Sequence, residues 1–486
     1  MSEKYLINGK YLPTIGVECH VQLKTKTKLF SGVSNDARDA EPNTLISPIC
    51  LGFPGTLPVL NKEAIHLAVK AGIALRAEIA NISHFDRKHY FYPDLPKGYQ
   101  ITQFERPIVG AGIVEAPLGN GEYVSVGITR AHLEEDAGKS SHPGGLDYSL
   151  VDLNRAGTPL LEIVSEPDIH SAAEAKAYAH ELYLLMKYAD VSDVDLYHGN
   201  MRFDVNVSVS DDFKKLGTRS ETKNLNSFKA VEKAVEYEIK RQIALLEKGQ
   251  KIVQETRGWD DAKQKTISQR SKEDAHDYRY FPDPDLPPVE VEQSYIDAQM
   301  EAMPTMPSAL RALFGALGLT EAQIDTIIEE PQMSNILRQI LEQKDEKTAK
   351  IVGNWLTGEL QRQITDNEIT LQQIKQVTNE MVMLASMLDS ASLSSTAAKE
   401  VLVEVVKTGK DPEEIAKSKN LLQVSDESEL VMIVEQVISE NEKAAQDVRN
   451  GEMKAIGFLV GQVMKQSQGR ANPAKVQELL KKQLGA

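Results

Sequence analysis

Two stretches in the N-terminal half of the chain alternate between apolar and polar residues. Between residues 201 and 209 the apolar positions are Met201, Phe203, Val205, Val207 and Val209, and the positions between them are polar. Between residues 17 and 23 the polar positions are Glu18, His20 and Gln22. A period of two over this length predicts antiparallel strands, each with one face in a core and one polar face.

Helical spacing replaces this alternation in two places. After Asn226-Ser227 the apolar residues recur at helical spacing from Val231 to Leu246, which predicts a helix that ends near Gly249. After a proline-rich run at residues 282–288, helical spacing continues to the end of the chain. Within that part we expect a turn at the serine-rich residues 390–395, and Asp411-Pro412 is typical of the start of a helix.

These patterns predict an α+β protein. We expect an N-terminal antiparallel-sheet domain over residues 1–295, an all-α linker domain over 296–411 and a small α-helical tail domain over 412–486. A chain of 486 residues has room for three domains of roughly 150 residues each.

The composition narrows the class of protein. The chain has 55 Lys and Arg against 71 Asp and Glu, a net charge of −16, and 41% hydrophobic residues, so it is neither disordered nor a protein that coats nucleic acid by bulk charge. The two cysteines, Cys19 and Cys50, are too few for a disulfide framework. No segment resembles a signal peptide or a membrane span, and we expect a soluble cytoplasmic protein.

Acidic residues and histidines form the first group of candidate functional residues. They are Glu18 and His20, the run His132-Leu133-Glu134-Glu135-Asp136, Glu162 and Asp204. Glu162 interrupts an apolar run, where a charge is costly unless it is paired. Carboxylates that gather without enough cations repel one another, and a divalent metal is the usual remedy. Oxygen ligands favour Mg²⁺ and an imidazole admits Mn²⁺; the alternative is that these residues are solvated charges on strand faces and turns.

Basic residues form two further groups, and the P-loop motif is absent from the sequence. The run Arg87-Lys88-His89-Tyr90-Phe91-Tyr92 combines cations that can hold phosphates with rings that can stack on bases, or it is a packed hairpin corner. The segment 217–226 delivers Lys223 and Asn224 to a helix start, where a phosphate could sit; the alternative is an ordinary N-cap. The last segment, 451–486, carries a local excess of cations: Lys454, Lys465, Arg470, Lys475, Lys481 and Lys482.

Long motifs along the whole chain resemble the GatB subunits of the tRNA-dependent amidotransferases (GatCAB). They include G-V-E-C-H-V-Q-L at 16–23, R-K-H-Y-F-Y-P-D-L-P-K-G-Y-Q at 87–100, H-L-E-E-D-A-G-K at 132–139, D-L-N-R-A-G-T-P-L-L-E-I-V-S-E-P-D at 152–168, M-R-F-D-V-N-V-S at 201–208 and D-Y-R-Y-F-P-D-P-D-L-P-P at 277–288. G-F-L-V-G-Q-V-M-K at 457–465 and G-R-A-N-P at 469–473 are similar to the family's YqeY-type tail.

The resemblance implies a kinase-like cradle domain, a helical linker domain and a YqeY-like tail that contacts tRNA. It implies that ATP phosphorylates the side-chain carboxylate of misacylated Glu-tRNA(Gln) or Asp-tRNA(Asn), and that ammonia from the glutaminase subunit GatA then gives the amide. GatC would complete a heterotrimer. By resemblance six residues line a Mg²⁺ site: Glu18, His20, Glu134, Glu135, Glu162 and Asp204.

Further residues are assigned to substrate and tRNA. The candidates for binding ATP or the aminoacyl group are Arg87, Lys88, Tyr92, Lys97, Arg202, Arg219, Lys223 and Asn224. The candidates for tRNA contacts in the tail are Lys454, Lys465, Arg470 and Lys475.

The sequence departs from the family pattern in three places. Many relatives carry two cysteine pairs for zinc around residues 31–50, whereas here Cys50 alone remains, and we expect no zinc. His89 stands where relatives commonly have Asn, and Leu196-Tyr197-His198-Gly199-Asn200 stands where many have an acidic segment. The changes at His89 and Tyr197-His198 leave open a tRNA-binding scaffold with a decayed catalytic site, and the acidic strands leave open a metal-dependent hydrolase of nucleotides.

Overall fold

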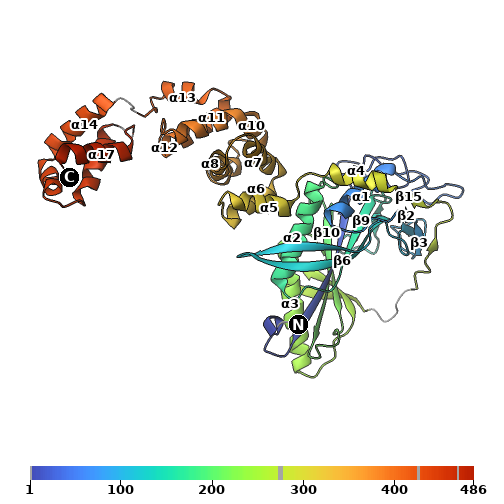
Figure 1. Ribbon diagram of the computed structural model, residues 1–486. Helices are drawn as coiled ribbons and strands as arrows, with labels where there is room; N and C mark the ends of the chain where they lie inside the picture. Colours follow the sequence, from blue (N-terminus) through green and yellow to red (C-terminus); the bar gives the residue numbers. More distant parts are fainter. Residues whose placement is uncertain (1–2, 272–276, 424–426, 468–469, 486) are drawn as a thin grey trace. The chain divides into compact units, whose positions relative to one another are not determined.

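The computed structural model describes residues 3–271, 277–423, 427–467 and 470–485, which divide into two compact units (Figure 1). The first unit is Met1–Pro307 and the second is Ser308–Ala486. The first unit includes α4 (Gln293–Glu301), whose Ile296 belongs to its buried core. The division into three domains at residues 295 and 411 stays a prediction.

An 11-stranded sheet organises the first unit. Its strands are β1 (Leu12–Gln22), β3 (Asp86–His89), β4 (Tyr99–Thr102), β5 (Gly112–Gly119), β6 (Glu122–Glu135), β9 (Pro159–Ser165), β10 (Met201–Ser210), β11 (Ser220–Leu225), β12 (Glu255–Asp260), β13 (Lys265–Ser271) and β14 (Phe281–Pro282). Two small sheets pair β2 (Ile82–Ser83) with β15 (Val289–Glu290) and β7 (Lys139–Ser141) with β8 (Leu150–Asp152).

The strand order of the large sheet is β13-β12-β11-β10-β1-β9-β6-β4-β3-β14, with β5 paired to β6. Neighbouring strands are antiparallel, as predicted, except β11 and β12, which are parallel. The sheet is therefore mixed. The crossover that a parallel pair requires is supplied by α3 (Phe228–Glu247), which lies between β11 and β12 in the chain.

Helices cover the apolar face of this sheet (Figure 1). α1 (Lys62–Ala74) contacts β6, α2 (Ala172–Tyr188) contacts β5 and β1, and α3 contacts β10. The alternating apolar residues Val17, Cys19 and Val21 are buried in the same core as these helices. The predicted helix after Asn226 is confirmed: the Ser227 side chain caps α3 by accepting the backbone N–H of Ala230 at 3.1 Å. The opposite face of the central strands stays polar.

The described residues of the second unit form helices and turns. The helices are α5 (Pro307–Ala316), α6 (Glu321–Glu329), α7 (Pro331–Gln343), α8 (Glu346–Thr357), α9 (Glu359–Thr365), α10 (Leu371–Gln376), α11 (Thr378–Asp389), α12 (Ser395–Thr408), α13 (Pro412–Ser418), α14 (Glu427–Glu440), α15 (Glu442–Arg449), α16 (Ala455–Gln466) and α17 (Pro473–Leu484). The serine-rich turn joins α11 to α12, and the Asp411 carboxylate caps α13, as predicted.

The C-terminal helices α14 to α17 share a buried core of their own, to which Val434, Val448, Leu459 and Leu480 contribute. Gly469 of the G-R-A-N-P motif lies outside the described residues. None of the helices in the described ranges combines the length and the apolar character that crossing a bilayer requires.

Candidate active site

A row of paired residues crosses four central strands on the polar face of the sheet. Arg202 of β10 lies opposite His20 of β1, His20 lies opposite Glu162 of β9, and Glu162 lies opposite His132 of β6. Directly paired residues in antiparallel strands point to the same face. Four residues that are far apart in the sequence are therefore brought side by side.

The first acidic group consists of His20 and Glu162 of this row together with Glu134 of β6. The candidate ligand atoms of these three residues all lie within 4.8 Å of one another. Nε2 of His132 lies 3.3 Å from Oε2 of Glu162, and Nε2 of His20 lies 3.7 Å from the same oxygen. Burial alone would raise the pKa of Glu162, but the imidazoles of His132 and His20 lower it below its usual value. Glu162 is thus held as a carboxylate.

The second acidic group lies on the neighbouring strands and consists of Glu18, Asp204 and Glu221, again within 4.8 Å. Lys223 Nζ lies 3.2 Å from Asp204 Oδ2 and 3.0 Å from Glu221 Oε1, and the backbone N–H of Asn224 donates to Asp204 Oδ1 at 2.8 Å. Burial and the nearby carboxylates, Glu162 first, raise the pKa of Glu18 above its usual value. One ammonium therefore does not balance the negative charge of this group.

Two further cations border the acidic groups. Burial would lower the pKa of Lys88, but the charges of Glu134 and Glu162 hold it above its usual value. The Lys88 ammonium also lies 5.2 Å from the centre of the Tyr278 ring. Arg202 Nη2 lies 3.2 Å from Asp136 Oδ1. Positive charge is thus available on two sides of the acidic groups.

Five of the six residues predicted to line a metal site lie in these two groups, and Glu135 does not. Glu135 follows Glu134 in β6, so its side chain points to the opposite face of the strand. Its carboxylate forms a buried ion pair with Lys97 and accepts the backbone N–H of Ile101 at 2.9 Å. Lys97, predicted to bind substrate, is occupied in the same ion pair.

The remaining substrate candidates are dispersed. Arg87 is held by Asp283 and Asp285, each at 2.8 Å, which matches the packed-hairpin interpretation of its segment. Tyr92 is exposed in the loop after β3. Arg219 lines a hollow of about 540 Å³ that also borders Glu18. The tail candidates Lys454, Lys465 and Lys475 are exposed in the second unit, and the Arg470 guanidinium donates to the backbone oxygen of Ser467 at 3.3 Å.

Sequence reasoning assigned no role to His132, which contacts Glu162, or to Glu221, which belongs to the second acidic group. His132 lies two residues before Glu134, and Glu221 lies two residues before Lys223. The alternation that assigned Glu18 and His20 to one face would have placed His132 on the face of Glu134, since residues two apart share a strand face. The strand over 220–225 is short and polar, so its pattern alone did not distinguish it from a loop.

The side chain of Lys28 lies beside Cys50, within the region 31–50 where many relatives carry cysteine pairs for zinc. The buried Lys28 ammonium donates to the backbone oxygen of Leu45 at 2.7 Å and lies 3.7 Å from Cys50 Sγ, and Ser47 Oγ donates to the same sulfur at 3.2 Å. Burial favours the neutral thiol, yet the hydroxyl hydrogen bonds and the charge of Lys28 lower the pKa of Cys50.

We expect purified protein to contain no stoichiometric zinc, because the Lys28 ammonium would repel the ion and one thiol cannot complete a tetrahedral site. Elemental analysis of the metal-free and zinc-incubated protein measures this directly. About one zinc per chain after dialysis would contradict the prediction, and Cys50→Ser would then show whether this sulfur holds the metal.

The chain is similar to known proteins along nearly its whole length. Residues 13–297 match the family described as the GatB/GatE catalytic domain, and residues 335–484 match the GatB domain. The chain is 45% identical over 482 residues to the GatB subunit of the aspartyl/glutamyl-tRNA(Asn/Gln) amidotransferase of Carboxydothermus hydrogenoformans, covering 98% of this chain and 99% of that one. The chain belongs to the GatB family.

A second member of the GatB family gives the same coverage. The protein of Caldanaerobacter subterraneus subsp. tengcongensis is 47% identical over 477 residues, covering 98% of this chain and 99% of its own. The match to the GatB/GatE catalytic domain contains both acidic groups, and the GatB-domain match contains the cationic segment 451–484. The family resemblance found in the sequence is confirmed.

Proposed function

We propose that this chain transfers the γ-phosphoryl group of ATP to the side-chain carboxylate of misacylated Glu-tRNA(Gln) or Asp-tRNA(Asn), using the two acidic groups of the sheet. As a GatB protein, the chain is part of a carbon–nitrogen ligase that converts these misacylated tRNAs to Gln-tRNA(Gln) and Asn-tRNA(Asn), and its family uses ATP. The observation that carries the proposal is the pair of adjacent acidic groups bordered by Lys88, Arg202 and Lys223.

The chemistry requires activation before amide formation. A carboxylate is a poor electrophile, because an oxide ion is a poor leaving group. When a carboxylate oxygen attacks the γ-phosphorus, the bond to the β-γ bridging oxygen breaks, ADP leaves and an acyl phosphate forms. Ammonia then attacks the carbonyl carbon, phosphate leaves and a proton passes to solvent. The first step needs positioning and charge neutralisation more than covalent help.

The donor set fits a hard divalent cation. Glu18, Asp204 and Glu221 present only carboxylate oxygens, and His20, Glu134 and Glu162 add one imidazole nitrogen. The raised pKa of Glu18 supports this fit, since uncompensated negative charge at the second group is what a cation would relieve. Bound Mg²⁺ would neutralise phosphate charge and orient the γ-phosphate. These six residues are the proposed ligands.

The cations beside the groups have separate tasks in this proposal. Lys223 restrains Asp204 and Glu221, and the N–H of Asn224 fixes the other oxygen of Asp204. Lys88 faces Glu134 and Glu162 and can stabilise the negative charge that develops on the transferred phosphoryl oxygens. Arg202, beside His20, can hold a phosphate with its planar guanidinium.

Ammonia must come from outside this chain in the proposed reaction. We assign its production to the glutaminase subunit GatA, with GatC as the third member of a heterotrimer. Both cysteines of the chain are free, which suits the reducing cytoplasm where we place the reaction.

The decisive experiment follows radiolabelled ATP in the assembled heterotrimer. With Glu-tRNA(Gln) present, ADP release should rise well above the rate without tRNA, and it should match amide formed when glutamine is supplied. No ADP release in the presence of substrate would favour the tRNA-binding scaffold. Turnover that does not depend on tRNA would favour the nucleotide hydrolase.

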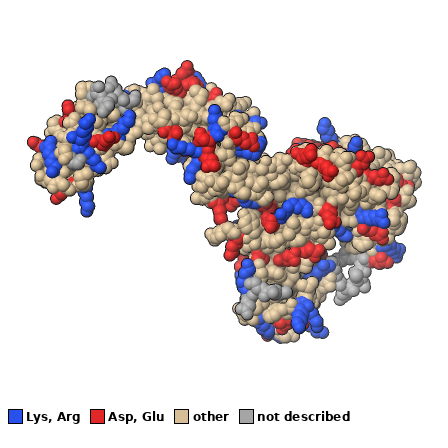
Figure 2. Space-filling model, in the orientation of Figure 1, with Lys and Arg blue, Asp and Glu red and all other residues tan. Residues whose placement is uncertain are grey.

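The C-terminal segment is proposed to bind the tRNA backbone. Between Gly451 and Ala486 it has six Lys and Arg against two Glu, on a chain of net charge −16. Figure 2 shows Lys and Arg side chains on the visible face of its helices. Contacts between cations and phosphates supply affinity and register but carry out no bond making.

Deleting residues 412–486 should raise the KM for aminoacyl-tRNA and leave kcat largely unchanged at saturating tRNA, with a smaller effect at low salt. Because a deletion can also destabilise the protein, the triple variant Lys454→Ala, Lys465→Ala, Lys475→Ala tests the charges alone, with exposed Lys399→Ala as control. Thermal unfolding is measured for each variant. An unchanged KM in both the deletion and the triple variant would remove the tail from tRNA binding.

A further inference from the structure

The ribbon formed by β3 and β4 is attached to β6 through a narrow contact. Inside the ribbon the two strands pair at four consecutive positions, from Asp86 opposite Thr102 to His89 opposite Tyr99. Within the described residues, however, β4 pairs with β6 at one position, Thr102 opposite Glu134. We call this pair the joint. The ribbon is therefore well paired within itself, but it has a single register pair with β6.

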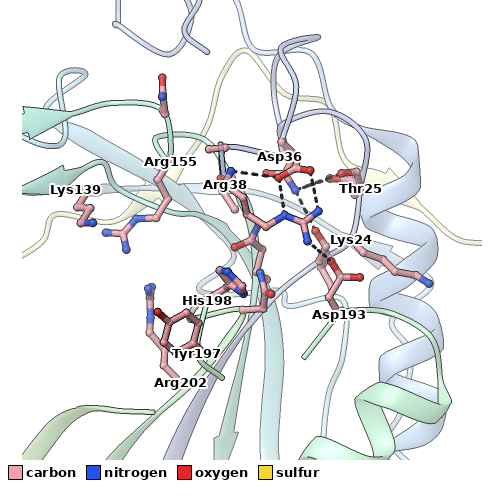
Figure 3. Close-up of a pocket in the computed structure, with 18 of the residues that line it drawn as sticks. Lys24, Thr25, Asp36, Arg38, Lys139, Arg155, Asp193, Tyr197, His198 and Arg202 are labelled. Atoms are coloured by element: carbon pink, nitrogen blue, oxygen red, sulfur yellow. Dashed lines mark hydrogen bonds and ion pairs between the residues drawn. The ribbon is translucent and has the colours of Figure 1, made fainter. Parts of the chain in front are cut away.

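The strand on the other side of the joint is held along its far edge. β6 pairs with β9 from Ile128 to Glu135. Directly after β6, the Asp136 carboxylate lies 3.3 Å from Arg155 Nε and 3.2 Å from Arg202 Nη2. Both arginines line the hollow drawn in Figure 3. Of the two sides of the joint, the ribbon is thus the one that is displaced more easily, because it has fewer strand contacts.

The ribbon carries Lys88 to the acidic groups, and the joint contains one of their members. Lys88 of β3 is the strand partner of Gln100 in β4, and Glu134 of β6 belongs to the first acidic group. The charge of Glu134 acts on Lys88 across the joint. The distance between this ammonium and this carboxylate therefore depends on how β4 lies against β6. A displacement of about 1 Å near reacting groups can cost about a hundredfold in rate.

The side chain of Gln103 connects the two strands on one side of the joint. Gln103 follows β4 directly and is fully buried. Its Oε1 accepts the backbone N–H of Leu133 at 3.1 Å and that of Ile108 at 3.2 Å, and its Nε2 donates to Ser83 Oγ at 2.7 Å. Leu133 immediately precedes Glu134, so this hydrogen bond fixes the backbone of β6 next to the first acidic group.

Glu135 connects the strands on the other side of the joint. Its Oε1 accepts the backbone N–H of Ile101 at 2.9 Å, and its backbone oxygen accepts Nε2 of Gln100 at 2.7 Å. The same carboxylate forms the buried ion pair with Lys97, which precedes β4. Side chains on both sides of the joint thus continue a hydrogen-bond ladder that the backbone itself forms at one position.

We propose that Gln103 and Glu135 are positioning residues of phosphoryl transfer. They connect β4 to β6 on the two sides of the joint, and they thereby hold Lys88 in place beside Glu134. This inference rests on the proposed function and adds to it two residues that set the geometry of the site. It also gives Glu135 a task on the face of β6 opposite the acidic groups, in place of the metal contact that the family resemblance implied.

The test compares two double variants that both lack the buried ion pair, each in the assembled heterotrimer. In Glu135→Gln, Lys97→Met the amide oxygen can still accept the Ile101 N–H, whereas the side chain in Glu135→Leu, Lys97→Met has no acceptor. The kcat of tRNA-dependent ADP release should be close to wild type in the glutamine variant and about a hundredfold lower in the leucine variant. The KM values for ATP and aminoacyl-tRNA should stay unchanged in both.

Gln103→Leu tests the other side of the joint and should also lower kcat, because the N–H of Leu133 loses its acceptor. Buried N–H groups without partners reduce stability, so thermal unfolding is measured and kcat is compared at a temperature where every variant is folded. Hydrogen exchange of the peptides that contain Ile101 and Leu133 should be faster in the leucine variants. In Glu135→Gln, Lys97→Met it should stay near wild type.

Three results would overturn the inference. A wild-type kcat in either folded leucine variant would show that the replaced side chain is not needed to position Lys88. Equal losses in the two double variants would show that the reaction needs the charges of Glu135 and Lys97 rather than the hydrogen bond, as a metal ligand would. A raised KM with unchanged kcat would place Glu135 in substrate binding. The proposed function is tested separately in the same assay by tRNA-dependent ADP release in the wild type.

Discussion

Replacing Glu162 by glutamine is expected to lower the rate of tRNA-dependent ADP release by a factor of about 10²–10³ or more, which is the usual cost of losing one preorganised electrostatic contact. The substitution keeps the volume of the side chain and removes the charge that faces His132 and His20. Without that carboxylate the first acidic group loses a proposed metal ligand and the partner of both imidazoles. The protein should remain folded, and tRNA should still bind.

The measurement is single-turnover phosphoryl transfer in the heterotrimer, with tRNA binding and thermal unfolding followed in parallel. Glu166→Gln is the matched control, because Glu166 follows the same strand, and its exposed carboxylate accepts the Thr129 hydroxyl and lies outside both acidic groups. Wild-type amide formation by a folded Glu162→Gln protein would remove Glu162 from the catalytic site.

Replacing Asp204 by asparagine should also lower the rate of phosphoryl transfer. Asp204 is the member of the second acidic group that binds both Lys223 and the N–H of Asn224, and it raises the pKa of Glu18. Asparagine can still accept the hydrogen bond from the backbone N–H of Asn224, so we expect the backbone conformation at Asn224 to be unchanged. The loss then comes from the missing charge.

The combined Glu162→Gln, Asp204→Asn protein distinguishes one reaction centre from two. Glu18 and His20 lie two residues apart in β1, so the two acidic groups adjoin and we expect them to serve one step. Losses within one catalytic unit are strongly non-additive, and the double variant should be little slower than the worse single variant. If the rate reductions of the two single variants multiply in the double variant, the two groups have separate roles.

Local features of this protein, such as strands and helix starts, could be predicted from the sequence. Alternation in 17–23 and 201–209 correctly predicted β1 and β10 and their polar faces, because side chains of a strand point alternately to its two sides. Helix starts were also readable, since a capping side chain such as that of Ser227 or Asp411 acts on backbone groups only two or three residues away. The family resemblance likewise needed only the order of the residues.

The residues of the candidate site could be predicted only in part from the sequence. Neighbouring carboxylates Glu134 and Glu135 look equivalent in the sequence, yet the alternation of β6 sends one to the acidic group and the other to Lys97 on the opposite face. The same rule applied consistently would have separated them. It would not have placed Glu221 beside Asp204, because that contact depends on β11 lying next to β10.

The sequence by itself therefore determined two of the central strands, the helix caps, the family and most of the residues that carry charge on the polar face. The tertiary structure alone decided which of those residues meet. The order β10-β1-β9-β6 brings together residues from four distant segments. The physical reason is range: alternation and capping act over a few residues, whereas strand order is set by the packing of the whole core.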